Sequence, residues 1–382
     1  MKDIVIGVDA SRNRSGGAIE HLLGIFSNIE PKEFNIKKVH LWAPYSVLQQ
    51  LESFDWLVKH HTRELQQSLI KQIWWQFKKL SFELKKNKCD ILFATDASSF
   101  SRFKPMVVLS QDMLSYEPGR IRAYGISTMA LRLISILFLQ NSVFRHADGT
   151  IFLTKYASEM IQRKTGALPK SICIPHGVDD SFRQIKEIDS FPINPNHPIK
   201  CIYVSNTEVY KNQWVVVKAI SALRDVGYNI HLKLVGGGKG TAQKLLINSL
   251  KKYDPRGEFV EITEFVQHSQ IADFLQAADI FIFASSCENM PVTLIEGMTS
   301  GLPIACSDRG PMPEVLQDGG VYFDPENSAS IAHAIEKLIN NKSIREDSAK
   351  RAKNLSEQYS WKRCANQTWT YIVDTYKDLS HG

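Results

Sequence analysis

The sequence predicts an α/β protein built from two parallel-sheet units. Short apolar runs of strand character alternate with segments of helical periodicity along both halves of the chain, the pattern of strands joined by crossover helices. The polar, proline-rich stretch at residues 183–198 interrupts this alternation and is the best linker, and a length of 382 residues exceeds one typical domain. We therefore expect an N-terminal domain over residues 1–185, a second domain over residues 195–358 and a terminal helix within residues 359–382.

The first half begins with an apolar run at residues 2–8, which predicts a buried strand. A loop over residues 9–17 follows, and Gly16 and Gly17 stand where this loop meets a helix expected from Ala18 onward. Glycines at such a junction permit positive φ and close backbone approach to a ligand, although the G-x-G-x-x-G dinucleotide fingerprint is absent. Helices are expected over residues 56–86 and 129–144, and further strands over residues 37–42, 89–95, 105–110, 149–153 and 171–174.

The second half repeats the alternation. Residues 236–240 (Gly-Gly-Gly-Lys-Gly) form a glycine-rich turn, but Lys233 stands where a P-loop requires its first glycine. The expected strands cover residues 199–204, 231–235 and 279–284, and the expected helices begin at Gln213, near Pro291 and at Trp361. Residues 301–305 are expected to end the helix near Pro291 and to start the next strand.

Composition restricts the class of protein. The chain is 43% hydrophobic and 23% charged, which is ordinary for a globular enzyme, and its net charge of +6 suits phosphorylated substrates or an anionic membrane surface. The basic residues are too diffuse to predict nucleic-acid binding. The six cysteines are scattered, no secretory leader precedes the first strand, and no apolar run reaches the roughly 18 residues of a spanning helix. We expect a cytoplasmic protein with reduced cysteines.

The most informative segment is residues 285–324. Glu288 lies in a loop after the apolar run 279–284, and Glu296 lies in a short helix that begins near Pro291. Strand, loop and helix in this order place the N–H groups of the helix start against an anion at the edge of an open sheet. Two surface carboxylates would show the same spacing, but this order favours carboxylates at opposite ends of a phosphate-bearing ligand such as a nucleotide sugar.

The motifs of this segment resemble the retaining family-4 glycosyltransferases, which have the GT-B fold. The resemblance rests on E-x7-E at Glu288 and Glu296, Gly301-Leu302-Pro303-Ile304, Ser307-Asp308-Arg309-Gly310 and Pro313-Glu314-Val315. It implies two Rossmann-like domains facing a central cleft, with a C-terminal helix that crosses back to the first domain. It also implies transfer of a hexose from a nucleotide-diphosphate sugar with no metal and no other cofactor, and no His, Cys, Asp and Glu group has metal-ligand spacing.

The resemblance also assigns residue roles. Lys211 matches the lysine that contacts the donor diphosphate, and Glu288 would act on the sugar near its anomeric carbon; these two are the catalytic candidates. Asn206 stands where the family has an arginine, a departure that removes one charge from the phosphate clamp. The family's first domain often supplies a histidine at the position of Gln111, which puts that role in doubt, whereas His176 is expected to be structural. The donor-binding candidates are Glu296, Val292, Thr293, Asn206, Gly16, Gly17 and Val266.

Within this family the chain looks most like bacterial transferases of surface-polysaccharide and O-antigen (lipopolysaccharide) biosynthesis, mannosyltransferases among them. The expected donor is GDP-mannose or a UDP-sugar, and the expected acceptor is a glycan or a polyprenyl-diphosphate-linked glycan. A sugar-nucleotide 2-epimerase and a catalytically silent nucleotide-sugar-binding subunit stay open as alternatives. Trp74, Trp75 and the helix at 129–144 suit peripheral docking on the cytoplasmic face of the inner membrane, but buried helix faces explain them equally.

Overall fold

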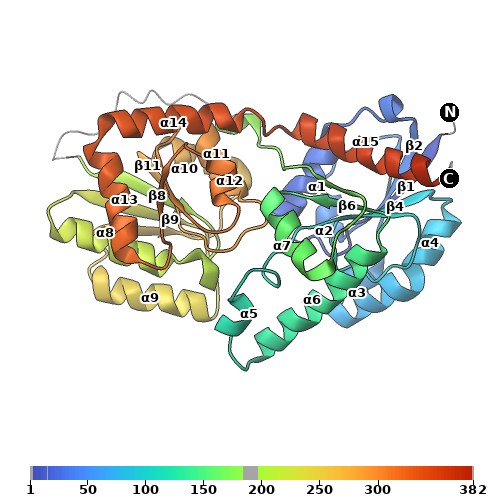
Figure 1. Ribbon diagram of the computed structural model, residues 1–382, viewed down its shortest axis with the longest axis horizontal. Helices are drawn as coiled ribbons and strands as arrows, with labels where there is room; N and C mark the ends of the chain where they lie inside the picture. Colours follow the sequence, from blue (N-terminus) through green and yellow to red (C-terminus); the bar gives the residue numbers. More distant parts are fainter. Residues whose placement is uncertain (1–2, 15, 184–196, 381–382) are drawn as a thin grey trace. The chain divides into compact units, whose positions relative to one another are not determined.

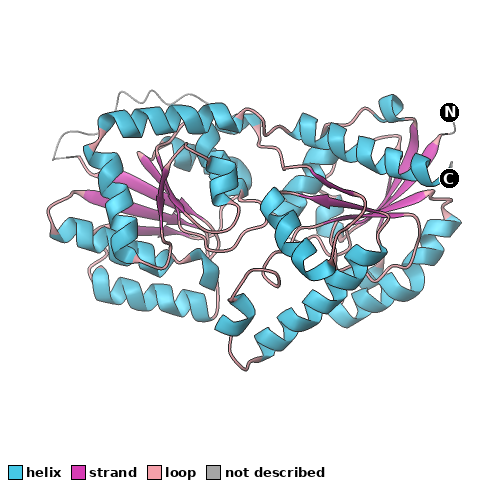
Figure 2. Cartoon of the chain, viewed as in Figure 1, coloured by secondary structure: helices cyan, strands magenta, loops and turns pink. Residues whose placement is uncertain are grey.

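The structure is a computed structural model that describes residues 3–14, 16–183 and 197–380. The chain divides into two compact units, one of residues 1–177 with 360–382 and one of residues 178–359 (Figure 1). Most of the predicted linker, residues 184–196, lies outside the described residues. Each unit holds one sheet with helices on both faces (Figure 2), which confirms the predicted class of two Rossmann-like α/β units.

The sheet of the first unit has seven parallel strands in the order β3-β2-β1-β4-β5-β6-β7. Its central strands are buried along their whole length and are almost entirely apolar, as is typical of a parallel sheet covered on both faces. The strands are β1 (Ile4–Asp9), β2 (Ile36–Trp42), β3 (Leu57–His60), β4 (Ile91–Ala94), β5 (Met106–Leu109), β6 (Gly149–Phe152) and β7 (Ser171–Cys173).

The helices of the first unit include one that comes from the C-terminal end of the chain. They are α1 (Gly17–Ser27), α2 (Tyr45–Leu48), α3 (Leu69–Trp75), α4 (Ser81–Lys86), α5 (Arg120–Ala123), α6 (Thr128–His146), α7 (Lys155–Thr165) and α15 (Trp361–Ser380). Short 3-10 turns lie at Pro31–Phe34 and Arg63–Gln66, and a π-helical turn, Gln76–Leu80, joins α3 to α4.

The expectation of one helix over residues 56–86 is wrong at its N-terminal end. Residues Leu57–His60 form β3, which pairs in parallel with β2, and the helix begins only at Leu69. The segment from residue 45 to residue 104 contains no glycine and no proline, so no turn-forming residue marks the boundary between the strand and the helix. These four residues form a strand because they pair with β2, and the neighbouring sequence does not reveal that pairing.

Helix α15 packs on α1 in the first unit. The Trp369 indole Nε1 donates to the Ile25 carbonyl at 2.9 Å, and its ring meets Phe26 edge to face with 5.5 Å between centroids. A Cβ on Gly24 would lie 2.1 Å from the Trp361 ring, so the glycine is needed for this close packing. The return of the terminal helix to the first unit is thus fixed by aromatic packing.

The sheet of the second unit has six parallel strands in the order β10-β9-β8-β11-β12-β13. The strands are β8 (Ile199–Val204), β9 (Ile230–Val235), β10 (Val260–Thr263), β11 (Ile280–Phe283), β12 (Ile304–Ser307) and β13 (Val321–Phe323). The helices are α8 (Gln213–Asp225), α9 (Thr241–Tyr253), α10 (Ile271–Gln276), α11 (Val292–Thr299), α12 (Met312–Leu316), α13 (Ser328–Asn340) and α14 (Lys342–Ser356). Short 3-10 turns lie at Asp180–Arg183, Val209–Lys211 and His268–Gln270.

Each sheet reverses its strand order at one place. The reversal falls between β1 and β4 in the first unit and between β8 and β11 in the second. The loops that leave these paired strands diverge to opposite sides, and the crevice beyond their carboxyl ends is where open α/β sheets bind ligands. In the second unit, those loops carry Lys211 and Glu288.

Candidate functional site

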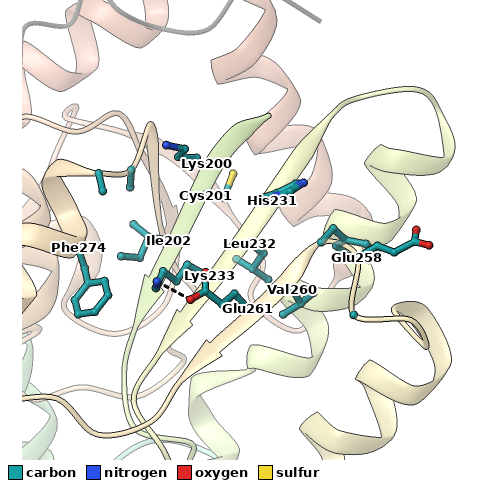
Figure 3. Close-up of a pocket in the computed structure, with 14 residues that line it drawn as sticks. Lys200, Cys201, Ile202, His231, Leu232, Lys233, Glu258, Val260, Glu261 and Phe274 are labelled. Atoms are coloured by element: carbon teal, nitrogen blue, oxygen red, sulfur yellow. Dashed lines mark hydrogen bonds and ion pairs between the residues drawn. The ribbon is translucent and has the colours of Figure 1, made fainter. Parts of the chain in front are cut away.

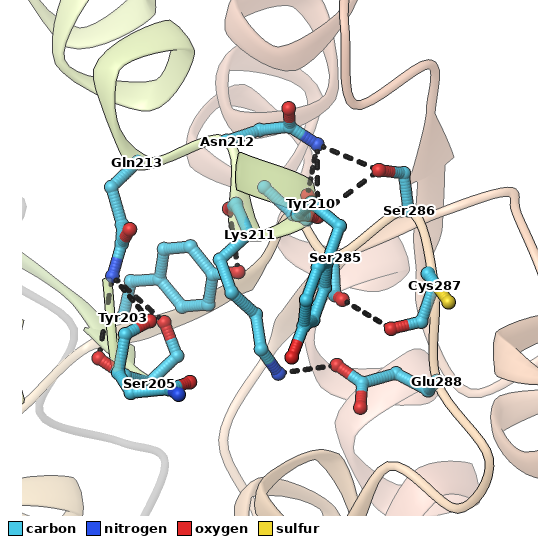
Figure 4. A network of polar contacts seen from close by, with 12 residues as sticks. Tyr203, Ser205, Tyr210, Lys211, Asn212, Gln213, Ser285, Ser286, Cys287 and Glu288 are labelled. Atoms are coloured by element: carbon cyan, nitrogen blue, oxygen red, sulfur yellow. Dashed lines mark hydrogen bonds and ion pairs between the residues drawn. The ribbon is translucent and has the colours of Figure 1, made fainter. Parts of the chain in front are cut away.

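Lys211 and Glu288 form an ion pair at the strand reversal of the second unit. Lys211 follows β8 and Glu288 follows β11, and the Lys211 Nζ donates to Glu288 Oε1 (Figure 4). The lysine side chain is 11% exposed and the glutamate side chain 14%. The Lys211 Nζ also lies 5.4 Å from the centre of the Tyr210 ring and 5.7 Å from that of Phe283. The two catalytic candidates are therefore brought together with little solvent around them.

Asn212 fixes the turn that presents Lys211. Its backbone is left-handed, with φ 54°, a conformation that asparagine tolerates better than most residues. Its side-chain Nδ2 donates to the Ala284 carbonyl at 3.0 Å and to Ser286 Oγ at 3.2 Å, and the Ser286 N–H donates to the Tyr210 carbonyl at 2.8 Å (Figure 4). These bonds join the loops after β8 and β11, so the positions of the lysine and the glutamate are coupled.

The glycine-rich turn after β9 closes against the loop after β8. A Cβ on Gly236 would lie 2.4 Å from the Ser205 carbonyl oxygen, and one on Gly238 would lie 2.5 Å from that of Thr207. The Thr207 N–H donates to the Gly237 carbonyl at 3.0 Å. These glycines are required for close approach of two backbones, which explains the turn without a P-loop.

Glu296 lies on α11 and is anchored by a histidine that sequence analysis did not identify. His268 Nε2 donates to Glu296 Oε1 at 2.6 Å, and Glu296 is only 2% exposed. Its second oxygen, Oε2, is buried and has no hydrogen-bond partner among the described residues. Buried carboxylate oxygens are almost always bonded, so this atom is suited to accept a ligand hydroxyl. No local motif marks His268, which follows β10 and meets α11 only in the folded unit.

The other donor-binding candidates of the second unit are less clearly placed to contact a ligand. Val292 and Thr293 are the first residues of α11, and the Val292 N–H already donates to the Met290 carbonyl at 3.0 Å. Asn206 is exposed in the loop after β8, and its carbonyl accepts from Gln213 Nε2 at 3.1 Å. Val266 is half-buried in the loop that leads from β10 to His268.

Gly16 and Gly17 belong to the first unit, where they open α1. Gly16 has φ 61° and is the N-cap of the helix, so a residue with a side chain would be strained there. Beside this loop is a buried carboxylate that sequence analysis missed. Asp9, at the end of β1, accepts from Ser99 Oγ at 2.8 Å and from Gln76 Nε2 at 3.0 Å, and burial raises the pKa of its carboxyl group. These bonds tie the end of β1 to the loop after β4 and to the π-helical turn.

Two further residues singled out in the sequence lie in the first unit. Gln111 has its Nε2 buried, and this atom finds no acceptor among the described residues. His176 is buried and stacks on His21 with 4.8 Å between ring centroids. Burial lowers the pKa of His21 to about 3 and holds that of His176 well below its ordinary value, so both rings are neutral at pH 7. This setting supports the structural interpretation of His176.

A separate cavity of about 390 Å³ lies at the amino-terminal ends of β8 and β9 (Figure 3). The Lys233 ammonium pairs with Glu261 at 2.8 Å there and lies 4.8 Å from the centre of the Phe274 ring. Lys211 and Glu288 follow the opposite, carboxyl ends of their strands, so this cavity is distinct from the candidate site.

Over the described ranges, no three or more His, Cys, Asp and Glu side chains are grouped to hold a metal ion. In the same part of the chain, no helix combines the length and the apolar character needed to cross a bilayer.

Part of the chain is similar in sequence to known proteins. Residues 184–355 match the family model "Glycosyl transferases group 1". The O-antigen chain mannosyltransferase B of Escherichia coli is 25% identical over 178 residues, which is 47% of this chain and 45% of that protein. A probable sucrose-phosphate synthase of Oryza sativa subsp. japonica is 24% identical over 242 residues, 56% of this chain and 22% of that protein. The matched part thus spans less than half the length of these relatives.

Solved structures are similar over almost the whole chain. The sucrose-phosphate synthase of Thermosynechococcus elongatus superposes with a TM-score of 0.77 at 15% identity and covers 99% of both chains. Anabaena HepE in complex with UDP and glucose gives a TM-score of 0.70 at 17% identity, covering 98% of this chain and 99% of HepE. WaaG, a glycosyltransferase of lipopolysaccharide biosynthesis, gives 0.71 at 15% identity, covering 97% and 99%. The chain therefore has the GT-B fold, and residues 184–355, somewhat less than half of it, are similar to the glycosyl transferases group 1 family.

Proposed function

We propose that this protein is a retaining glycosyltransferase that moves a hexose from a nucleotide-diphosphate sugar to a glycan or lipid-linked glycan in surface-polysaccharide biosynthesis. The observation that carries the proposal is the largely buried Lys211–Glu288 ion pair at the strand reversal of the second unit. Glu296 on the following helix supports it, because one of its buried carboxylate oxygens has no partner in the described part of the chain.

Lys211 would stabilise the nucleoside diphosphate as it leaves. An ammonium group has three N–H donors, so Lys211 can keep its contact with Glu288 and still donate to a phosphate oxygen. The Tyr210 and Phe283 rings limit water around the ammonium, and a charge placed beforehand in such a setting acts more strongly on charge that develops during the reaction.

Glu288 would hold sugar hydroxyls and favour the positive charge that develops at the anomeric carbon. Its contact with Lys211 places it beside the proposed diphosphate position, where the bond to the sugar breaks. This role is electrostatic, and the proposal needs no covalent bond to Glu288.

The remaining contacts would come from neighbouring elements. Glu296 Oε2 would accept from ribose hydroxyls, the α11 N-terminus with Thr293 would face the diphosphate, and the backbone near Val266 would contact the base. With Asn206 in place of an arginine, Lys211 carries more of the phosphate binding. Gly16 and Gly17, at the start of α1, stay proposed donor-binding residues on the family resemblance alone.

The comparisons favour two donors. One relative is named a mannosyltransferase, which favours GDP-mannose, and HepE binds UDP and glucose, which favours a UDP-sugar. We propose a polyprenyl-diphosphate-linked glycan as acceptor, cytoplasmic placement with peripheral contact to the inner membrane, and no metal or other cofactor.

The test is a donor screen. The purified chain is incubated with GDP-mannose, UDP-glucose and other UDP- and dTDP-sugars, with and without lipid-linked glycan extracts, and nucleoside diphosphate and sugar products are quantified. Release of the nucleoside diphosphate with a product of retained anomeric configuration supports the proposal. Conversion of the donor to its C2 epimer, or binding without turnover of any donor, would overturn it.

A further inference from the structure

The first unit exposes large apolar side chains on the helical stretch formed by α3, the π-helical turn and α4. Ile70 is 78% exposed and Trp74 50%, and Phe77 follows them one turn later at 40%. Side chains spaced by three or four residues lie on one face of a helix, so these three form a row. The opposite face, with Gln72, Trp75 and Leu80, is buried and already packs into the unit. The row is therefore not explained by packing within the unit.

Helix α6 exposes a second apolar row. Leu131 is 66% exposed, Ile134 37% and Phe138 71%, while Leu133 and Phe144 of the same helix are buried. The spacing of i, i+3 and i+7 again places the three exposed residues on one face. A helix on the surface of a globular protein normally carries polar side chains on its solvent-facing side.

One hollow lies between Phe77, at the end of the first row, and helix α6. Phe77 and, from α6, Leu139, Ser142 and Val143 line a hollow of about 550 Å³, and Ser142 lies one turn beyond Phe138 on the same face of α6. We call this area, defined by Ile70, Trp74, Phe77, Leu131, Ile134 and Phe138, the α3–α6 surface.

Positive charge lies along the α3 side of the α3–α6 surface. Residues 69–86 contain five lysines and one acidic residue, Glu83. Lys78 Nζ and Arg102 Cζ each lie 5.0 Å from the centre of the Phe77 ring, and Lys79 Nζ lies 5.4 Å from that of Trp74. Lys79 also pairs with Glu64 at 2.5 Å. Cations held over apolar rings are arranged to meet anions at the boundary of an apolar phase.

We propose that the α3–α6 surface rests on the headgroup layer of an anionic lipid bilayer. Trp74, Phe77 and Phe138 enter the interfacial region, and the lysines and Arg102 meet lipid phosphates. A second copy of the chain fits less well, because a two-fold contact through this surface would bring the two sets of lysines together. The inference deepens the membrane contact of the proposed function by naming the surface and the lipid charge.

The test is vesicle flotation with the full chain and no donor or acceptor, so it can fail independently of the proposed activity. Wild type should float with vesicles of phosphatidylcholine and phosphatidylglycerol, float far less with phosphatidylcholine alone, and dissociate at high salt. The double variant Trp74→Ser/Phe138→Ser should lose most of the flotation. Lys78→Gln/Lys79→Gln should lower partitioning about tenfold.

Matched controls come from the second unit. Val226 is 71% exposed, the same as Phe138, and Lys251 and Lys252 are adjacent exposed lysines, with Lys252 Nζ lying 5.0 Å from the centre of the Tyr253 ring. Val226→Ser and Lys251→Gln/Lys252→Gln should float like wild type. Phe138→Ser alone serves if the double variant loses its thermal transition.

Three outcomes would overturn the inference. These are equal flotation of the wild type and the α3–α6 variants, equal flotation with neutral and anionic vesicles, and a wild-type dimer in light scattering that Phe138→Ser converts to a monomer. If instead the variants stop floating but keep wild-type transfer to a water-soluble acceptor, the surface acts in membrane contact alone and the proposed activity stands.

Discussion

The imidazole of His268 and the carboxylate of Glu296 are joined by a hydrogen bond of 2.6 Å that uses only one of the two carboxylate oxygens. The other oxygen is buried and has no partner among the described residues. His268 thus fixes the rotamer of Glu296 while leaving one strong acceptor for a ligand. This division makes Glu296 a binding residue and His268 a positioning residue in our interpretation.

We expect Glu296→Ala to weaken binding of the bare nucleoside diphosphate, because the ribose contact exists without any sugar. Loss of a charged acceptor from hydroxyl donors predicts about 1.5–3 kcal/mol in binding free energy. Isothermal titration calorimetry measures it, with Glu261→Ala at the far edge of the sheet as control. Unchanged affinity in a folded Glu296→Ala protein would remove this residue from the site.

For His268→Ala we expect a smaller loss of nucleotide affinity, of about 1 kcal/mol, because the carboxylate remains but is no longer held. In a Glu296→Ala background the same change should cost almost nothing, since the histidine acts through the glutamate. The double-mutant cycle is measured by calorimetry. Full additivity of the two losses would mean that His268 contacts the ligand independently.

Kinetic measurements should distinguish the role of Lys211 from that of Glu288. Lys211→Ala should weaken donor binding and lower kcat together, because the diphosphate is present in the ground state and gains charge as the bond breaks. Glu288→Gln should leave nucleoside-diphosphate affinity nearly unchanged and reduce kcat by several powers of ten, the pattern of an interaction made mainly in the transition state. Transfer at the parental rate by Glu288→Gln would contradict its catalytic role. Because the pair is buried, thermal melting of both variants must accompany the kinetics.

Transfer activity should persist in excess EDTA. The proposal neutralises the diphosphate with Lys211 and helix N–H groups, so no divalent ion is needed. Initial rates with and without chelator, and with added Mg²⁺ or Mn²⁺, test this. Activity that disappears with EDTA and returns with either ion would show that the charge is neutralised in another way.

The buried His21–His176 stack predicts acid sensitivity of the first unit. The folded pKa of His21 is lowered to about 3 and that of His176 is also lowered, whereas an unfolded histidine titrates near 6.5. Between these values the unfolded chain binds more protons, so these residues make the free energy of unfolding decrease as the pH falls below about 6.5.

His176→Asn should therefore make this decrease less steep, by up to about 1.4 kcal/mol per pH unit. Denaturant unfolding at pH 7 and pH 5 measures the difference, with the exposed His146→Asn of the same unit as control. Identical pH dependence in wild type and His176→Asn would show that the ring is not held neutral.

Much of the fold was predictable because parallel strands buried on both faces are apolar runs bounded by breakers. The runs around Ile91–Ala94 and Ile280–Phe283 are of this kind, and the structure places strands there. Strand β3 was missed because Leu57–His60 has no breaker beside it and becomes a strand only by pairing with β2. For the site, the family resemblance singled out Lys211, Glu288 and Glu296, and their roles stay predictions.

By itself, the sequence determined the alternation of strands and helices, and the motifs that mark the second unit, because both depend on residues close together in the chain. Only the tertiary structure decided which side chains become hydrogen-bond partners. It joined Lys211 to Glu288 across 77 residues, His268 to Glu296 across 28 and Gln76 to Asp9 across 67. Such contacts arise where the carboxyl ends of strands distant in sequence become neighbours in a sheet, and no local pattern encodes which strands those are.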